Sequence, residues 1–209
     1  MKLAEKETAP RRKTGRPLSF DRDVALEQAM LTFWRHGYET TSIVDLTTAM
    51  GITAPSLYTA FGDKKQLFLE SARRYAGDPE AITEMLDQAV TSCDGARAML
   101  ISAVTAFTSD ATPKGCLLAS ATASGSSASA DVQRAIADIR EGITARLRAR
   151  ITRDVETGIL PADINVAAVA GMVMAIIQGM SVLARDGMDR PELHAIVERT
   201  LQAWPVCRK

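Results

Sequence analysis

The sequence predicts an all-α protein with an N-terminal three-helix head and a larger helical body. Apolar residues recur at helical spacing along most of the 209 residues, and Ser, Thr or Asp precedes several of these segments as a helix N-cap. No segment shows the alternating pattern of a β-strand. A chain of this length forms one or two domains with a substantial core. We expect a basic arm at residues 1–19, a head at 20–76 and a body at 77–209.

The head begins with an amphipathic helix predicted at residues 21–36. Its apolar residues lie at i, i+4, i+7 and i+8, and they are Leu26, Met30, Phe33 and Trp34. Gly37 follows directly and is a typical residue at the end of a helix. The helix therefore has one face for burial inside the head.

Two short helices joined by a glycine turn are predicted in residues 42–61. Ser42 is an N-cap followed three residues later by an aspartate, which forms a capping box, and Gly51 ends this helix. Thr53 is the N-cap of the second helix, and Pro55 lies in its first turn, where a missing N–H costs nothing. This order of elements is the helix-turn-helix plan, in which the second helix enters the major groove of DNA.

The outer face of the second helix carries short side chains that would let its backbone approach a DNA groove closely. They are Thr53, Ala54, Ser56 and Thr59. A plain corner of two capped helices has the same spacing, so the spacing alone leaves both interpretations open. The next helix begins after Asp63 with Lys64 and Lys65 in its first turn, where the helix dipole disfavours cations. A phosphate bound nearby would explain their position.

The residues around this motif resemble the tetracycline-repressor (TetR) family of bacterial transcriptional regulators. The resemblance rests on Gly37, Tyr38, Thr41, Ser42, Leu46, Gly51, Ile52, Thr53, Ser56, Leu57, Tyr58, Phe61 and Lys64. It covers residues 20–70 and continues through Leu67 without gaps. The chain departs from the family pattern at Thr47, Met50 and Pro55, where alanine, a small residue and glycine are usual.

The resemblance implies a ligand-responsive regulator, a repressor rather than an activator, released from its operator by a small-molecule inducer. Its partner would be double-stranded DNA, with Thr53, Ala54, Ser56 and Thr59 at base edges and Pro55 stiffening the helix that carries them. Phosphate contacts would come from Thr41, Ser42, Tyr58 and Lys64. A homodimer formed through helices at about 129–157 and 164–186 would bind an inverted repeat, because a two-fold axis relates its two heads.

The N-terminal arm is strongly basic. Residues 1–19 carry six basic and two acidic side chains, and a formal charge of +3 over residues 1–76 contrasts with −3 over residues 77–209. The Gly-Arg-Pro sequence around Arg16 suits an extended segment in the narrow minor groove of A·T-rich DNA. A solvated basic terminus is the alternative interpretation. The arm is too short and too polar for a signal peptide.

The body is predicted to consist of successive helices. We expect them at about 80–92, 95–109, 116–122, 129–157, 164–186 and 190–203. Asp94 is expected to be the N-cap of the second of these helices, and Asp189 begins a capping box at the last. A turn at 112–115 and a serine-rich loop at 124–129 separate the short helix from its neighbours.

The helix at 164–186 is nearly all apolar and long enough to cross a bilayer. It contains Gln178 and Ser181, and it lacks flanking aromatic residues and a basic cluster on one side. We therefore expect it to be buried in a protein core or interface, with no membrane partner.

The resemblance also implies a small-molecule pocket between the body helices at residues 80–180. The candidate lining residues are Met85, Met99, Ala103, Phe107, Cys116, Leu117, Met172, Ile176 and Met180. Methionines suit an adaptable apolar pocket, and ordinary packing of the core is the alternative for each residue.

Three cysteines, Cys93, Cys116 and Cys207, show no C-x-x-C spacing, which is typical of a reduced, cytoplasmic protein. Cys116 follows a Lys-Gly turn at a predicted helix start, so it is a candidate redox or electrophile sensor. With Cys93 it is also a candidate ligand for a soft metal. A buried, inert thiol is the third interpretation, and we place no metal in the expected site.

No catalytic site and no cofactor are predicted. The two histidines, His36 and His194, lack a nucleophile and an orienting partner that the sequence reveals. No phosphate-binding loop or dinucleotide motif is present in the sequence. The remaining alternative to a regulator is a DNA-binding architectural protein without an effector. Saturable binding of a ligand that weakens a specific DNA complex would separate the two.

Overall fold

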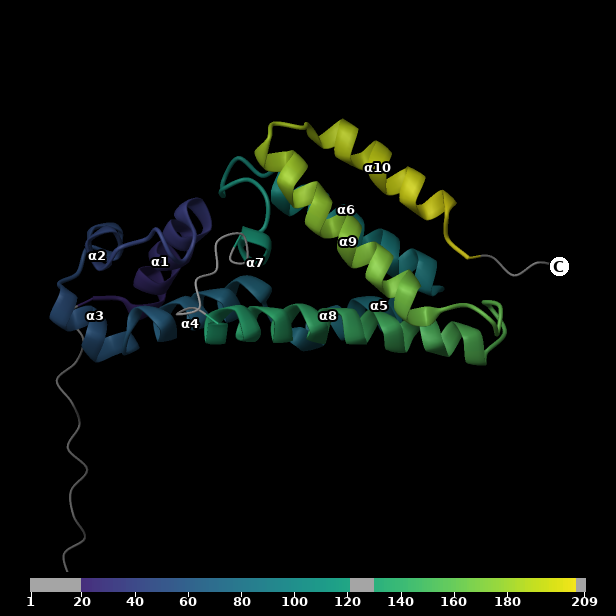
Figure 1. The fold of residues 1–209 in the computed structure, drawn as a ribbon, viewed down its shortest axis with the longest axis horizontal. Helices are drawn as coiled ribbons and strands as arrows, with labels where there is room; N and C mark the ends of the chain where they lie inside the picture. Colours follow the sequence, from purple (N-terminus) through teal and green to yellow (C-terminus); the bar gives the residue numbers. More distant parts are fainter. Residues whose placement is uncertain (1–19, 121–129, 206–209) are drawn as a thin grey trace, which may run out of the picture.

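The computed structural model describes residues 20–120 and 130–205, and every element in them is a helix. The predicted all-α class is therefore confirmed. Arg16, the predicted serine-rich loop at 124–129 and Cys207 lie outside the described residues. Figure 1 shows the head at one end of the molecule, with the body helices extending away from it.

The head is built from three helices, α1 (Arg22–His36), α2 (Ile43–Met50) and α3 (Ala54–Phe61). Each begins at a polar N-cap and ends at a glycine. These start and stop signals are local in the sequence, and the helix bounds agree with the predicted ones to within a residue or two. Helix α4 (Lys64–Ala76) packs against α1 in the head and against the body.

The body contains α5 (Pro79–Gln88), α6 (Ser92–Phe107), α7 (Leu117–Ser120), α8 (Ala130–Glu156), α9 (Val166–Arg185) and α10 (Arg190–Gln202). Helix α8 runs beside α4 and α5, while α6, α9 and α10 form a second group inclined to it (Figure 1). The short α7 contacts both α1 and α4, so it lies where the head meets the body.

The boundary between α5 and α6 differs from the prediction. Helix α5 ends at Gln88, and α6 begins at Ser92 with Thr91 as its N-cap. Asp94, the predicted cap, instead lies inside the first turn and accepts a hydrogen bond from the Thr91 backbone N–H at 3.1 Å. Because a Thr-x-x-Asp capping box contains two residues that both favour caps, the pattern identified the wrong one.

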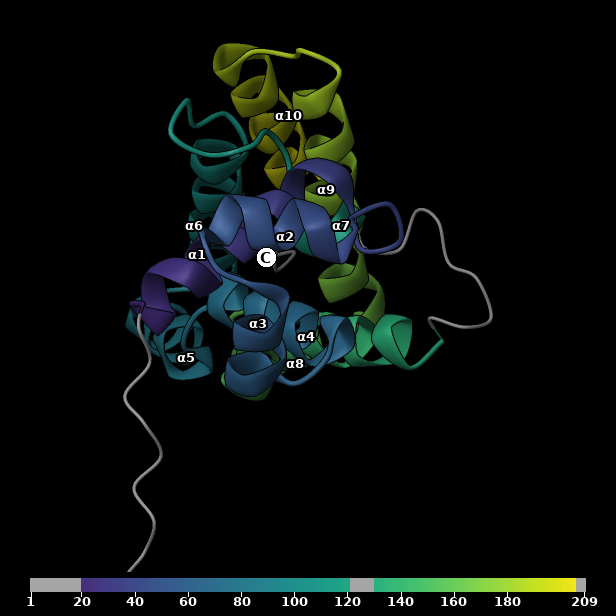
Figure 2. The same ribbon diagram turned by 90° about the vertical axis from the view of Figure 1, so that its left-hand side faces the viewer.

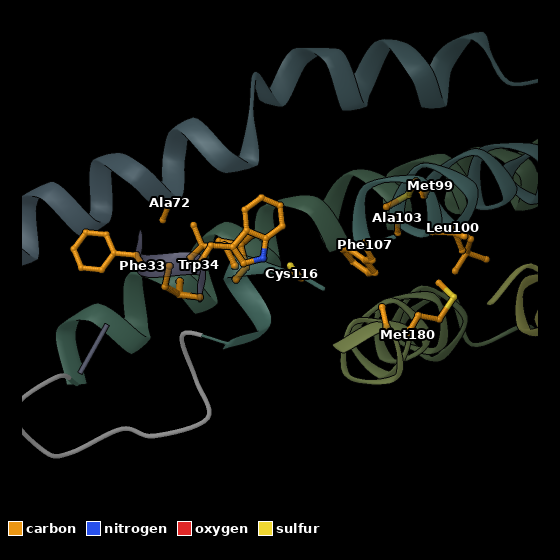
Figure 3. Close-up of a cluster of buried hydrophobic side chains, with 14 of the residues drawn as sticks. Phe33, Trp34, Ala72, Met99, Leu100, Ala103, Phe107, Cys116 and Met180 are labelled. Atoms are coloured by element: carbon orange, nitrogen blue, oxygen red, sulfur yellow. The ribbon is translucent and has the colours of Figure 1, made fainter. Parts of the chain in front are cut away.

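One hydrophobic core runs through head and body. Figure 3 shows part of it, from Phe33 and Trp34 in the head, past Cys116, to Phe107, Met99 and Met180 in the body. The Phe33 ring contacts the Phe68 ring of α4 edge to face, with centroids 5.0 Å apart. Helix α4 packs against both α1 and α8, so it joins the packing of the head to that of the body.

Helix α9 has the length and apolar composition of a membrane span, but only 22% of its most apolar window is buried inside the chain. A line of small residues at spacing i+4 is exposed along it, namely Ala167, Gly171, Ala175 and Gly179. The sequence predicted that this helix is buried either in a protein core or in an interface. The structure excludes burial in the core of the single chain for most of the helix. Its exposed face has the smooth, apolar character of a helix–helix interface.

Candidate functional site

The helix-turn-helix is held by local hydrogen bonds. The Ser42 hydroxyl accepts from the Asp45 backbone N–H at 3.1 Å, and the Asp45 carboxylate accepts from the Ser42 N–H at 2.8 Å. The hydrogen bonds from Ser42 lower the pKa of Asp45, so its carboxylate stays charged at the N-terminus of α2. Gly51 ends this helix with φ of 65°, a left-handed conformation that glycine adopts without strain.

Helix α3 has a buried side and an exposed side. Leu57 is fully buried and Phe61 nearly so, whereas Pro55, Tyr58 and Thr59 are exposed. Figure 2 looks onto the head, with α3 among the elements nearest the viewer. The predicted base-contacting helix is therefore an outer surface of the molecule, anchored from behind by two apolar side chains.

The hydroxyl groups of α3 and its cap form hydrogen bonds within the helix. The Thr53 and Ser56 hydroxyl oxygens are 2.9 Å apart, and the Thr59 hydroxyl donates to the Pro55 carbonyl at 2.8 Å. Ala54 and Ser56 are half-buried at the start of the helix. These bonds orient the short side chains before any ligand binds.

The predicted phosphate contacts lie in different environments. Tyr58 is 51% exposed and Ser42 is exposed, whereas Thr41 is buried and donates its hydroxyl to the Gly37 carbonyl at 2.6 Å. The Lys64 ammonium lies 4.7 Å from the centre of the Tyr38 ring. Burial lowers the pKa of Lys64.

The position of Lys65 in the first turn of a helix predicted an anion nearby, and in the structure a carboxylate lies beside it. Its ammonium donates to Asp131 of α8 at 2.7 Å, which joins the start of α4 to the start of α8.

Arg22 is a structural residue that the sequence patterns did not reveal. Its guanidinium makes two bonds to Glu70, at 2.6 and 2.7 Å, and also donates to the Ala60 carbonyl at the end of α3. Arg22 thereby orients α3 against α1 and α4.

Two adjoining apolar cavities lie in the body, with volumes of about 310 and 360 Å³. They share the side chains of Ala76, Ile82, Ser102 and Ile177, which come from α4, α5, α6 and α9. The walls include the end of α4 and the turn that follows it at Gly77. A molecule bound here would contact the helix that carries the head.

Five of the nine predicted pocket residues line these cavities: Ala103, Phe107 and Cys116 in the first, Met85 and Met99 in the second. Leu117 and Met180 are buried in the core, and Met172 and Ile176 are half-buried on α9 outside both cavities. Helix α9 instead contributes Met174, Ile177 and Gln178. Because this helix is apolar on nearly every side, its sequence carries no signal for which side faces inward.

Cys116 is buried, with 6% of its surface exposed. Its backbone N–H donates to the Ser181 hydroxyl at 2.8 Å, and its carbonyl accepts from Arg185 at 3.3 Å, so α9 holds this turn. Burial and the proximity of Cys116 raise the pKa of Tyr75. Cys93 and Cys116 are both free thiols. In residues 20–120 and 130–205, no three His, Cys, Asp or Glu side chains gather as a metal site would require.

Comparisons with known proteins agree with this geometry. Residues 25–71 match the family model of bacterial regulatory proteins, tetR family, and residues 95–202 match the tetracyclin repressor-like C-terminal domain. The HTH-type transcriptional repressor ComR of Escherichia coli strain K12 is 36% identical over 193 residues, which cover 91% of this chain and 92% of ComR. The chain therefore belongs to the TetR family and is a helix-turn-helix transcriptional regulator.

Two solved structures extend the comparison. A cysteine variant of the TetR family regulator CifR, complexed with a 26bp double-strand operator DNA, is 40% identical with a TM-score of 0.86, covering 91% of this chain and all of that one. A TetR regulator from Rhodococcus sp. RHA1 is 35% identical with a TM-score of 0.61, covering 88% of this chain and 99% of that one. The arrangement of head and body is thus shared over nearly the whole chain.

Proposed function

We propose that this protein is a transcriptional repressor that binds a double-stranded DNA operator as a homodimer and leaves it when a small molecule occupies the body. The exposed, anchored α3 is the observation that carries this proposal. The names of ComR, a repressor, and CifR, complexed with operator DNA, support it. This role requires no enzymatic activity. It also implies a cytoplasmic location, because the operator DNA lies in the cytoplasm.

On the DNA, the proposed base contacts are Thr53, Ala54, Pro55, Ser56 and Thr59. Ser42, Tyr58 and Lys64 would contact phosphates, and Arg16 would lie in the minor groove. Phosphate contacts position a protein on the duplex, whereas base contacts provide specificity. Thr41 takes a supporting role in this arrangement, because its hydroxyl is already bonded to the Gly37 carbonyl.

The homodimer would form through α8 and α9 of each protomer. The exposed face of α9 is apolar, and a Cβ atom added at Gly171 or Gly179 would meet nothing within 4 Å in the single chain. Glycine costs helix stability, so its presence there is explained by close approach of a partner helix. A two-fold axis would then place the two α3 helices about 34–36 Å apart, in successive major grooves.

The effector would be a small, largely apolar molecule in the adjoining cavities. Ala76 and Gly77, at the end of α4, form part of the walls, and α4 also packs against α1. An occupied cavity would favour one position of α4 and hence one spacing of the two heads. The shift in DNA affinity is limited by the difference in ligand affinity between the two positions.

A second candidate function is a response to thiol-reactive molecules through Cys116. It is favoured by one observation, that Cys116 lines the first cavity beside Ala103 and Phe107. Treatment with N-ethylmaleimide would then release the wild-type protein from its operator and leave Cys116→Ala bound. Equal behaviour of the two proteins would eliminate this candidate.

The proposed function is tested by footprinting the purified protein on the DNA upstream of its own gene, at increasing salt. A protected inverted repeat that persists at physiological salt is expected. Removal of residues 1–16 should weaken binding and reduce its salt dependence, because fewer phosphates are neutralised. Diffuse protection that salt abolishes on every sequence tested would instead indicate an architectural DNA-binding protein.

A further inference from the structure

We propose that α3 recognises its operator chiefly through the methyl groups of thymines, so that the base pairs beneath it are mostly A·T. This inference rests on the proposed function, because it assumes that α3 enters a major groove. It specifies which chemical feature of the bases the helix would contact.

The composition of α3 excludes the usual paired contacts to purines. Arginine or lysine typically contacts guanine through two bonds, and asparagine or glutamine contacts adenine in the same way. Helix α3 contains none of these four residue types. Its exposed and half-exposed positions hold Ala54, Pro55, Ser56, Tyr58, Thr59 and Ala60.

The hydroxyl groups of this surface have few protons to donate. The Thr59 hydroxyl donates to the Pro55 carbonyl at 2.8 Å, so the side chain offers DNA its methyl group and oxygen lone pairs. Thr53 and Ser56 share one hydrogen bond of 2.9 Å, which leaves one hydroxyl proton between the two residues. Guanine offers only acceptors from its own major-groove edge, so such a surface has little to give it.

The basic side chains beside α3 have partners within the protein. Arg22 bonds to Glu70 at 2.6 Å, and Lys65 bonds to Asp131 at 2.7 Å. Lys64 lies against the Tyr38 ring and donates to the Glu39 carbonyl at 3.3 Å. Without rearrangement, none of the three supplies the donor pair that α3 lacks.

Apart from the Tyr58 hydroxyl, which we propose contacts a phosphate, and the one proton left between Thr53 and Ser56, the groups that remain are apolar. Ala54 and Pro55 begin α3, Thr59 lies one turn after Pro55 with its methyl group free, and the thymine methyl is the apolar group of the major groove. The free energy of removing one such methyl group from water corresponds to a change in affinity of about fourfold. Cytosine lacks the methyl, so replacing a contacted T·A pair by C·G loses that contact.

The test uses the operator defined by footprinting, with each thymine replaced in turn by deoxyuridine, which lacks only the methyl. We expect about fourfold weaker binding at two or more thymines beneath α3, and no change at thymines outside the protected repeat. Thr59→Ser removes the side-chain methyl, whereas Thr59→Val keeps it and removes the hydroxyl. Thr59→Ser should bind about fourfold more weakly and become insensitive to one of the uracil changes, while Thr59→Val should retain that sensitivity.

The outcomes separate this inference from the proposed function. If the protein discriminates its operator from scrambled DNA but every uracil substitution leaves affinity unchanged, recognition through thymine methyls is wrong and the regulator stands. If no sequence is bound better than scrambled DNA, the proposed function fails and the inference with it. Circular dichroism melting of each variant shows that it is folded before its affinity is compared.

Discussion

Arg150 and Asp154 form a buried ion pair, one turn apart on α8, that organises the turn between α5 and α6. The Arg150 guanidinium donates to the Leu86 carbonyl in the last turn of α5 and to the Ala89 and Val90 carbonyls that follow this helix, at 3.0 to 3.1 Å. Asp154 accepts from the Ser92 backbone N–H at 2.6 Å, at the start of α6. The pair therefore positions two helices that line the second cavity.

Removing either member of this pair should strongly destabilise the protein. Arg150→Ala or Asp154→Ala leaves an unpaired buried charge, which typically costs about 3–5 kcal/mol of unfolding free energy. Urea denaturation measures this loss. Arg153→Ala, on the same helix, breaks an exposed ion pair with Asp87 and should cost less than about 1 kcal/mol. Equal losses at positions 150 and 153 would contradict the role of the buried pair.

Stability should depend on pH through Asp154. Burial alone would raise the pKa of this carboxyl, but hydrogen bonds from Ser92 and Arg150 outweigh burial, and the pKa is lowered. A lowered folded-state pKa contributes stability above the unfolded pKa of about 3.9, and this contribution is lost as the pH falls through the folded value. The stability difference between wild type and Asp154→Asn should hence shrink below about pH 4. A constant difference from pH 7 to pH 3 would show that Asp154 does not titrate there.

Tyr58 should contribute to DNA binding without providing specificity. Its ring is half exposed beside the proposed base-contacting positions, where a hydroxyl bond to phosphate is expected to contribute about tenfold in affinity. Tyr58→Ala should weaken operator and scrambled DNA alike in fluorescence anisotropy at fixed salt. Tyr58→Phe keeps the ring and removes the hydroxyl, so its affinity shows how much of the loss comes from the hydroxyl alone. A loss confined to the operator would identify Tyr58 as a base contact instead.

The oligomeric state should depend on the small residues of α9. Gly179→Leu places a larger side chain in open space of the single chain, so the protomer should remain folded. The same side chain would separate two packed α9 helices, and sedimentation should show a shift from dimer to monomer. Ala195→Leu, at an exposed position on α10, is the matched control. A Gly179→Leu protein that stays dimeric would place the interface elsewhere.

Filling the first cavity should abolish binding of apolar molecules while preserving DNA binding. Ala106 lines this cavity from an exposed position at its opening, and an Ala106→Trp side chain turned inward is large enough to occupy much of the volume of about 310 Å³. Titration with the uncharged dye Nile red, followed by fluorescence, should show saturable binding to wild type and at least about tenfold weaker binding to the variant. Ala195→Trp is the control for a surface tryptophan. Identical titrations of all three proteins would show that the dye does not enter the cavity.

The head was predictable because its signals are local. Ser42, Gly51 and Thr53 act on residues within one helical turn of themselves, and the observed α2 and α3 follow those positions closely. The start of α6 was not predictable in this way, since Thr91 and Asp94 both suit a cap. At the cavity, the side of α9 that faces inward could not be predicted, because the polar residues of that helix are too few to define a face.

The sequence by itself determined where the helices of the head begin and end, which family the head resembles and which short segment is suited to a DNA groove. Tertiary structure alone decided which side chains have internal partners, as in the bond from Lys65 to Asp131, 66 residues apart. It also decided that α9 keeps an exposed apolar face and that Ala76 and Ile177 meet around a cavity. Caps and turns depend on neighbours within a few residues, whereas burial, ion pairs and cavities depend on packing between distant helices.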